Sequence, residues 1–265
     1  MIIGKSPLIV RNLGRLSYNR CLDIQRSLSE PSHDDGKNTL LLVEHSSPIF
    51  TIGSNECKDG VNILKSKSSE MGVEVHNVDK RGNGIVWHGP GQLTIYPIIN
   101  NNNTSSEETI KSLSKVVKKT LSMLGITCTI ESDGIYVGNK HKIGDFELFS
   151  NEMINPGFSI NINPNLSYYT KLLESEKNTS VWNHTNRSIS IGEVLPILLQ
   201  NFDQEYAGNV IDSKKLYQMR FDQSSTTSSS SSRTSPTSTT PKDNDALIRD
   251  YYLSTQPRRL SNATL

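Results

Sequence analysis

Hydrophobic and polar positions along the first 210 residues follow two periods, and each period predicts one kind of element. Short apolar or alternating runs predict strands at 6–10, 39–45, 47–54, 72–79, 84–87, 92–99, 126–130, 134–137, 140–148 and 157–162. Apolar residues three and four positions apart predict helices over 15–28, 106–124 and 194–202. Because the strands come in consecutive groups, the pattern favours an α+β fold with a mixed, largely antiparallel sheet and packed helices.

The ends of the second and third predicted helices are marked by specific residues. Ser105 with Glu108, and Ser190 with Glu193, have the spacing of a capping box. Gly125 suits the end of the second helix, because glycine readily takes the left-handed conformation found there. These signals agree with the apolar period on the bounds of the second helix, whereas Pro196, inside the first turns of the third helix, leaves its exact start open.

Composition divides the chain into a domain and a tail. Residues 1–210 carry the periodic apolar pattern and are long enough for one domain. Residues 211–265 form a tail in which 223–242 are nearly all serine and threonine. Such a segment cannot bury enough apolar surface to offset the entropy lost on ordering, so we expect it to be disordered.

Charge and cysteine content exclude several classes of protein. The formal net charge is +1, which gives no broad attraction to nucleic acid or to an acidic membrane surface. No apolar run approaches the roughly 20 residues that span a bilayer. Cys21, Cys57 and Cys128 lie far apart, which predicts neither a disulfide framework nor a zinc site. We expect a reduced, intracellular protein without a metal, a cofactor, a nucleic-acid partner or a membrane span.

The stretch "DKRGNGIVWHGPGQLTIYPI", residues 79–98, concentrates candidate chemistry. Its glycines let backbone N–H groups approach a ligand closely. Arg81 can make a forked contact to an anionic or amide group, and His88 can move a proton near neutral pH. A glycine-rich hairpin with a surface histidine explains the same letters, since "HGPG" is a good turn in itself. No helix follows, so the stretch is not a nucleotide phosphate loop.

A second candidate is "GNKHKIGDFEL", residues 138–148. On a regular strand Lys140 and Lys142 point to one face, and their mutual repulsion would lower the pKa of one or both of them. A lysine with a lowered pKa can act as a general base or nucleophile. The alternative is an exposed basic strand end. Farther on, Ser175 and Ser180 lie in a polar loop, and no GxSxG motif names a hydrolase.

Several of these stretches together resemble the octanoyltransferases of lipoate biosynthesis, the LipB family. The similarity runs through "LLVEHSSPIFTIG", "RGNGIVWHGPGQLTIYPI", "DGIYVGNKHKIG", "GFSININPNLS" and "NTS", over roughly residues 10–208. The resemblance implies the lipoate/biotin protein ligase-like fold. It also implies transfer of an octanoyl group from acyl carrier protein to a lysine of a lipoyl domain, as found in 2-oxoacid dehydrogenase and glycine cleavage proteins.

The resemblance also implies a set of site residues. Lys142 takes the place of the family's strand lysine, which activates a catalytic cysteine. Counting from "NPNLS" puts Ser175 at the position of that cysteine, and no cysteine follows Cys128. The expected acyl pocket is lined by Arg81, Gly82, Asn83, Gly84, Ile85, Val86, Trp87, His88, Asp145, Phe146, Glu147, Gly157, Phe158 and Ser159.

Departures from the family pattern leave alternatives open. Asn83, Val86 and Trp87 differ from the family within the arginine motif, and larger or charged residues follow Lys142. A serine hydroxyl is far less acidic than a thiol, so one lysine activates it less well. The chain is therefore expected to be either an octanoyltransferase or an inactive relative that binds the acyl chain, the carrier protein or the lipoyl domain. An ATP-using lipoate or biotin ligase is a third reading.

Location is predicted from two features. The first 22 residues contain no acidic side chain and carry Lys5, Arg11, Arg15 and Arg20, a composition mildly similar to a mitochondrial presequence. The family's role in eukaryotes also points to mitochondria. The alternative is a cytoplasmic protein whose N-terminal residues form the first strand.

Overall fold

The computed structural model describes most of the first 212 residues. The described ranges are 8–29, 38–53, 58–78, 80–81, 84–98, 106–138, 140–149, 157–173, 175, 177–206 and 210–212. The predicted serine- and threonine-rich disordered segment, the turn at 31–37, Ser105, Gly82 and Asn83 lie outside these ranges. The last described strand, Val210–Asp212, crosses the boundary expected at residue 210.

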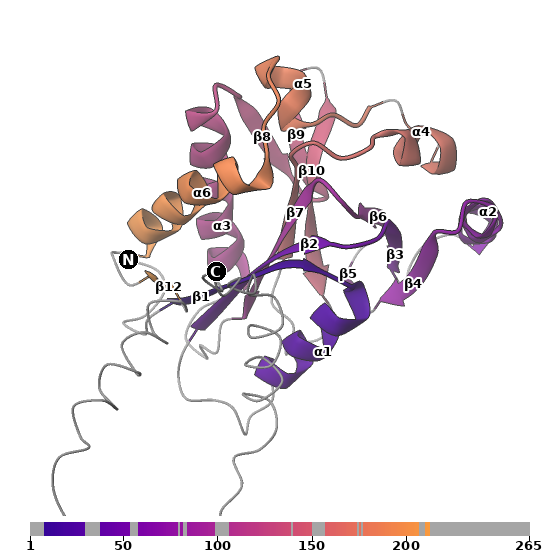
Figure 1. The fold of residues 1–265 in the computed structure, drawn as a ribbon, viewed down its shortest axis with the longest axis horizontal. Helices are drawn as coiled ribbons and strands as arrows, with labels where there is room; N and C mark the ends of the chain where they lie inside the picture. The colour runs from indigo at the N-terminus through magenta and orange to yellow at the C-terminus, as the bar shows by residue number, and fades with distance from the viewer. Residues whose placement is uncertain are drawn as a thin grey trace, which may run out of the picture. The chain divides into compact units, whose positions relative to one another are not determined.

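Nine strands form one large sheet, shown at the centre of Figure 1. In spatial order they are β12 (Val210–Asp212), β1 (Leu8–Leu16), β2 (Asn38–His45), β7 (Gln92–Ile98), β11 (Gly157–Asn161), β10 (His141–Phe149), β9 (Gly134–Val137) and β8 (Cys128–Glu131), with β5 (Lys80–Arg81) also paired to β10. β1 runs parallel to both of its neighbours, and the other pairs are antiparallel. The predicted α+β class with a mixed, largely antiparallel sheet is confirmed.

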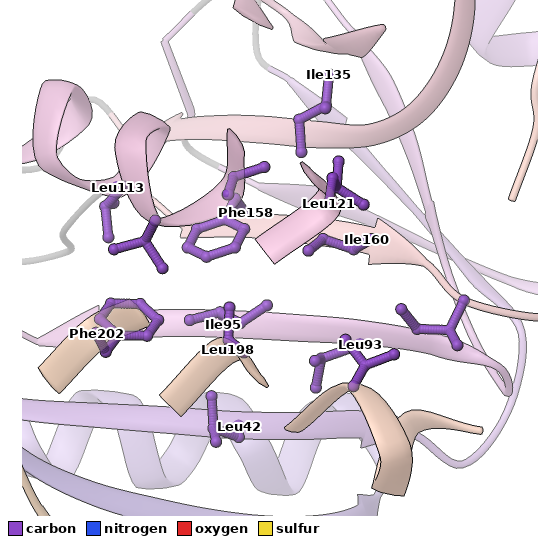
Figure 2. Packing of buried hydrophobic residues seen from close by; sticks show 14 of the residues in the cluster. Leu42, Leu93, Ile95, Leu113, Leu121, Ile135, Phe158, Ile160, Leu198 and Phe202 are labelled. Atoms are coloured by element: carbon purple, nitrogen blue, oxygen red, sulfur yellow. The ribbon is translucent and has the colours of Figure 1, made fainter. Parts of the chain in front are cut away.

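Two long helices, α3 (Ser106–Met123) and α6 (Ile191–Glu205), cover one face of this sheet (Figure 1). Figure 2 shows the core between them: Leu93, Ile95, Phe158 and Ile160 from the sheet meet Leu113 and Leu121 of α3 and Leu198 and Phe202 of α6. The rings of Phe158 and Phe202 stack with centroids 6.5 Å apart. Burial of these apolar side chains is the main source of stability on this face.

A three-stranded sheet forms a second, smaller core. Its order is β4 (Glu74–Val78), β3 (Ile49–Gly53) and β6 (Ile85–His88). Helices α2 (Lys58–Glu70) and α4 (Ser167–Leu173) pack against it, through a cluster that contains Phe50, Ile52, Leu64, Val73, Trp87, Tyr169 and Leu172. α1 (Tyr18–Ser29) contacts β7, and the short α5 (Val181–Thr185) follows α4.

Most predicted element ends agree with the structure. The capping box at α6 is formed: the Glu193 N–H donates to Ser190 Oγ at 3.3 Å, and Ser190 N–H donates to Glu193 Oε2 at 2.8 Å. Gly125, at φ +79°, follows the end of α3. The first helix begins at Tyr18 and not at residue 15, because β1 continues through Leu16.

Three of the described helices, α2, α4 and the five-residue α5, were not predicted. α2 has an interior glycine and only three strongly apolar residues, so its apolar period is weak. α4 follows the "NPNLS" turn and holds seven residues, too few for a periodic signal. None of the described helices is long and apolar enough to cross a membrane.

Candidate acyl-transfer site

The two faces of the large sheet differ in character. Leu93, Ile95, Phe158 and Ile160 alternate along β7 and β11 into the apolar core, so the residues between them point to the other face. That face carries polar side chains, each at most 4% exposed: Gln92, Thr94, Asp145, Ser159 and Asn161. Burying unpaired polar groups is costly, so a buried polar face on a central sheet indicates a binding or catalytic site.

Strand pairing arranges part of this face in one row. Ser159 on β11 is paired on one side with Thr94 of β7 and on the other with Asp145 of β10. Asp145 is in turn paired with Gly134 of β9. Ser159 Oγ is buried and has no hydrogen-bond partner among the described residues. We call Thr94, Ser159, Asp145 and Gly134 the polar row.

The side chains of Gln92 and Asn161 lie beside the polar row, and hydrogen bonds hold both of them. Gln92 Nε2 donates to Asn161 Oδ1 at 3.1 Å and to the Trp87 carbonyl at 2.9 Å. Asn161 Nδ2 donates to the Thr179 carbonyl at 3.2 Å, and the buried Tyr169 hydroxyl donates to Asn161 Oδ1 at 3.4 Å. These bonds fix the orientation of both amides, so this part of the site is rigid.

Lys142 reaches the polar row because β10 carries a bulge. The pairing register of β10 with β9 shifts between Lys142 and Gly144. Residues three apart normally point to opposite faces of a strand, but this extra residue puts Lys142 and Asp145 on the same face. Lys142 Nζ lies 2.8 Å from Asp145 Oδ1. A β-carbon on Gly134 would collide with Lys142 Cε, so the lysine chain occupies the space that this glycine leaves.

The charge state predicted for the lysine pair is wrong. Lys140 lies before the strand, is exposed and has φ +71°, so it does not share a face with Lys142. Burial alone would lower the pKa of Lys142, but the charge and hydrogen bond of Asp145, with help from Asp133 at 3.4 Å, raise it above its ordinary value. Lys142 is therefore a fixed cation at neutral pH and not a general base.

Tyr136 extends this network toward solvent. Its hydroxyl donates to Asp133 Oδ2 at 2.8 Å, and Lys142 Nζ lies 5.9 Å from its ring centroid. Burial and this hydrogen bond raise the pKa of Tyr136 to about 12. Tyr136 also lines a hollow of about 430 Å³ that includes Cys128 and His184.

Ser175 lies in the loop after α4, and three later residues of this loop, Lys177 to Thr179, run beside the backbone of Lys142. An isolated bridge pairs Lys142 with Asn178, and the Asn178 side chain donates to Ser175 Oγ at 3.0 Å. The structure thus brings the loop to the lysine, although the bonded partner of the Ser175 hydroxyl is an amide. Ser180 is buried and caps α5, where its hydroxyl accepts the Asn183 N–H at 3.3 Å.

His88 is fully buried, so the interpretation of a surface histidine is wrong. Its Nδ1 lies 2.9 Å from Gln92 Oε1. Because an amide oxygen only accepts, this bond places the ring proton on Nδ1. His88 also belongs to a ring cluster: Tyr18 lies 5.5 Å from His45 and 4.9 Å from His76, and His45 lies 5.4 Å from His88, measured between centroids.

The second glycine of "HGPG", Gly91, allows a close approach of backbone to backbone. Gly91 has φ +84°, and a β-carbon there would lie 2.5 Å from the Asn163 carbonyl oxygen. The Gly91 carbonyl accepts N–H groups of Ile162 and Asn163, both at 3.0 Å, and its own N–H donates to Glu44 Oε1 at 3.0 Å. The turn therefore joins β7 to the segment that follows β11.

Other predicted pocket residues divide between the faces. Phe146 and Phe158 lie in the core under α3 and α6, so their side chains point away from the polar face, contrary to the expected lining. Trp87 and Ile85 face the smaller core, because the alternation of β6 puts only Val86 and His88 on its other side.

Backbone pairing places the rest of the predicted lining. Arg81 pairs with Leu148, and Glu147 pairs with Gly157. The Gly84 carbonyl accepts the Gly53 N–H at 3.1 Å.

Sequence reasoning missed several residues of the site. His45, Asn161 and Tyr169 are buried at this site. The first two lie inside "EHSSP" and "GFSINI", stretches that already carried the family resemblance, so the motif itself could have indicated them. Asp133 and Tyr136 flank Lys142 because β9 pairs with β10, and no local pattern in the sequence reveals that pairing. Within the described part of the chain, no three His, Cys, Asp or Glu side chains are grouped so as to hold a metal ion.

The fold, with this buried polar face, is that of the lipoate-protein ligase class. It is similar to lipoate-protein ligase A bound with ATP (TM-score 0.62, 14% identity, 96% of this chain and 97% of that chain). It is also similar to a putative lipoate protein ligase from T. acidophilum with bound lipoic acid (TM-score 0.60, 14% identity, 83% and 96%). At this identity the likeness establishes the fold alone.

Sequence comparison then identifies the family. The lipoyl protein ligase A/B catalytic domain matches residues 17–207, and the chain belongs to this family. An octanoyltransferase of Alkaliphilus metalliredigens is 33% identical over 175 residues, which cover 63% of this chain and 78% of the relative. The mitochondrial octanoyl-[acyl-carrier-protein]:protein N-octanoyltransferase of Danio rerio is 28% identical over 217 residues, 78% and 95% of the two chains.

Proposed function

We propose that the chain is an octanoyl-[acyl-carrier-protein]:protein N-octanoyltransferase acting in protein lipoylation. The observation that carries the proposal is the family match over 17–207, together with octanoyltransferase relatives that align over most of their length. The donor is octanoyl-acyl carrier protein and the acceptor is a lysine of a lipoyl domain. The mitochondrial relatives support a mitochondrial location, and the cytoplasm is the alternative.

The proposed catalytic residues are Ser175 and Lys142. Ser175 Oγ attacks the thioester carbonyl, its proton leaves with the carrier thiolate, and the resulting ester is then attacked by the acceptor amine. Lys142, held as a cation, stabilises the negative charge that develops on the carbonyl oxygen. The contact that supports this pairing is the bridge between Lys142 and Asn178, whose side chain holds Ser175.

The proposed acyl-binding wall combines the polar face and the segment 81–88. The buried side chains that support it are His88, Val86, Asp145 and Ser159. Gly157 is also a proposed member, and the Ile95 carbonyl and the Tyr96 ring lie close to its α-carbon. Gly82, Asn83, Gly84 and the Arg81 and Glu147 positions remain proposed members. Phe146, Phe158, Ile85 and Trp87 support the wall from behind through their packing in the two cores.

One assay tests the activity and the nucleophile together. The full chain is incubated with octanoyl-acyl carrier protein, its intact mass is measured, and an apo lipoyl domain is then added. An octanoyl adduct that is lost in Ser175→Ala and kept in Ser180→Ala supports Ser175, and the reverse result assigns Ser180. Binding of the carrier protein with neither adduct nor transfer would show a relative that binds without catalysis.

A further inference from the structure

Asp145 is a buried carboxylate that already binds an alkylammonium group. Its side chain is 4% exposed, and its Oδ1 accepts Lys142 Nζ at 2.8 Å. A carboxylate can accept about four hydrogen bonds, so one ammonium does not saturate it. On the other side of Asp145, across the β10–β11 pair, lies Ser159, whose buried Oγ has no hydrogen-bond partner among the described residues.

The substrate of the proposed reaction supplies a group that fits this place. An acceptor lysine arrives as an ammonium ion, which needs oxygen acceptors and a negative charge where it is taken out of water. The polar row offers the Asp145 carboxylate and the Ser159 hydroxyl as adjacent acceptors. Solvent reaches this row at Lys142, whose side chain is 22% exposed.

We propose that Asp145 and Ser159 bind the ammonium of the acceptor lysine and that Asp145 takes its proton. This inference rests on the proposed function and adds to it the site of the acceptor. The step balances: the ammonium N–H bond breaks, the proton moves to the Asp145 carboxylate, and the free amine attacks the octanoyl carbonyl. A C–N bond forms, and the bond to the donor sulfur or serine oxygen breaks.

The charges around Asp145 act on the incoming ammonium in opposite directions. Asp145 binds the ammonium, whereas the like charge of Lys142 beside it lowers the pKa of the incoming group and so offsets the effect of the carboxylate. Lys142 itself is held charged by Asp145 and Asp133. The other titratable groups that face Asp145 are the hydroxyls of Tyr136 on β9 and Tyr169 on α4. Both phenols keep their protons, since burial raises their pKa values, so the incoming ammonium is the group that loses a proton.

A thermodynamic cycle tests the binding part without catalysis. Calorimetry compares the wild-type chain and Asp145→Asn, each with an apo lipoyl domain and with that domain's acceptor Lys→Met variant. Buried charge pairs couple strongly, so we expect Asp145→Asn to weaken binding of the lysine form about tenfold or more and of the methionine form less than about twofold. Asp203→Asn is the matched control: it neutralises an exposed carboxylate on α6, away from the polar row, and should change neither.

A second variant keeps the test decisive if Asp145→Asn fails to fold. Ser159→Ala should raise KM for the lipoyl domain about three- to tenfold, and should raise KM for octanoyl-acyl carrier protein less, because alanine keeps the β-carbon of the acyl-binding wall. Ser68→Ala removes another buried hydroxyl without a described partner, in α2, and should alter neither constant. In Asp145→Asn, kcat should recover as pH rises toward the ordinary lysine pKa of about 10.

The outcomes separate this inference from the proposed function. Equal weakening of both lipoyl-domain forms, or of neither, overturns the ammonium site, as does a wild-type chain that binds neither form. If the wild type transfers octanoyl while the cycle shows no coupling, only the inference fails. If coupling is present while no transfer occurs, the ammonium site is supported and the proposed reaction fails.

Discussion

Replacing Gly91 by alanine should destabilise the domain by about 2–5 kcal/mol. The left-handed backbone of this glycine, at φ +84°, costs an L-residue about 1–2 kcal/mol. The new β-carbon would lie 2.5 Å from the Asn163 carbonyl oxygen and 2.6 Å from its carbonyl carbon. Both are backbone atoms of Asn163, whose N–H donates to the Gly91 carbonyl, so relief requires a backbone shift that costs about 1–3 kcal/mol more.

Gly125 provides a matched control for the close approach. It has φ +79°, and a β-carbon there would meet nothing within 4 Å, so Gly125→Ala carries the conformational cost alone. Urea unfolding, followed by the fluorescence of the buried Trp87, gives the free energy of unfolding of each variant. The two alanine variants should differ by about 1–3 kcal/mol. Equal losses of unfolding free energy in the two variants would refute the view that Gly91 permits a close contact between two backbone segments.

Three further predictions test other parts of the structure. Phe158→Ala should lower the free energy of unfolding by about 3–5 kcal/mol in urea titrations, because the ring fills the core beside α6. Ser190→Ala should cost about 1 kcal/mol through the lost cap of α6. Hydrogen bonds from Ser190 lower the pKa of Glu193, so the Ser190–Glu193 interaction stabilises the fold above the unfolded pKa of Glu193. This stabilisation disappears as pH falls through the lowered pKa, so the urea midpoints of the wild-type chain and Ser190→Ala should converge in acid. The pKa of Tyr136 is raised to about 12, so stability should fall as pH rises between about 10 and 12, and Tyr136→Phe should remove this fall; identical alkaline profiles of the urea midpoint would contradict the assignment.

The sequence was sufficient for ten of the twelve described strands and for the three helices with a clear apolar period, because these depend on local periods and caps. The strands β5 and β12 are too short to show a period. The sequence was not sufficient for the relation between Lys142 and Asp145. Their spacing of three predicts opposite faces on a regular strand, and the register shift that reverses this is visible only in the pairing of β10 with β9. The same shift, with the left-handed backbone of Lys140, explains why the predicted pair of lysines does not exist.

The packing of distant helices, and not the local sequence, also decides which face of a strand meets the site. Alternation correctly separates Phe158 from Ser159, but both faces of β11 are buried, so burial does not tell them apart. The motif letters around Phe158 predicted that the whole stretch lines a pocket. Only the packing of α3 and α6 shows that the aromatic side chain belongs to the core and the hydroxyl to the polar face.

The position of β1 has a consequence for synthesis on the ribosome. β1 lies between β2 and β12, and its residue Leu8 pairs with Val210. During translation, one side of the apolar segment Leu8–Val10 therefore has no partner until the residues of β12 have left the ribosomal tunnel. An unpaired apolar strand edge is prone to associate with other chains, and chaperones protect such edges in nascent proteins. The first described strand to be synthesised is thus among the last to gain both of its neighbours.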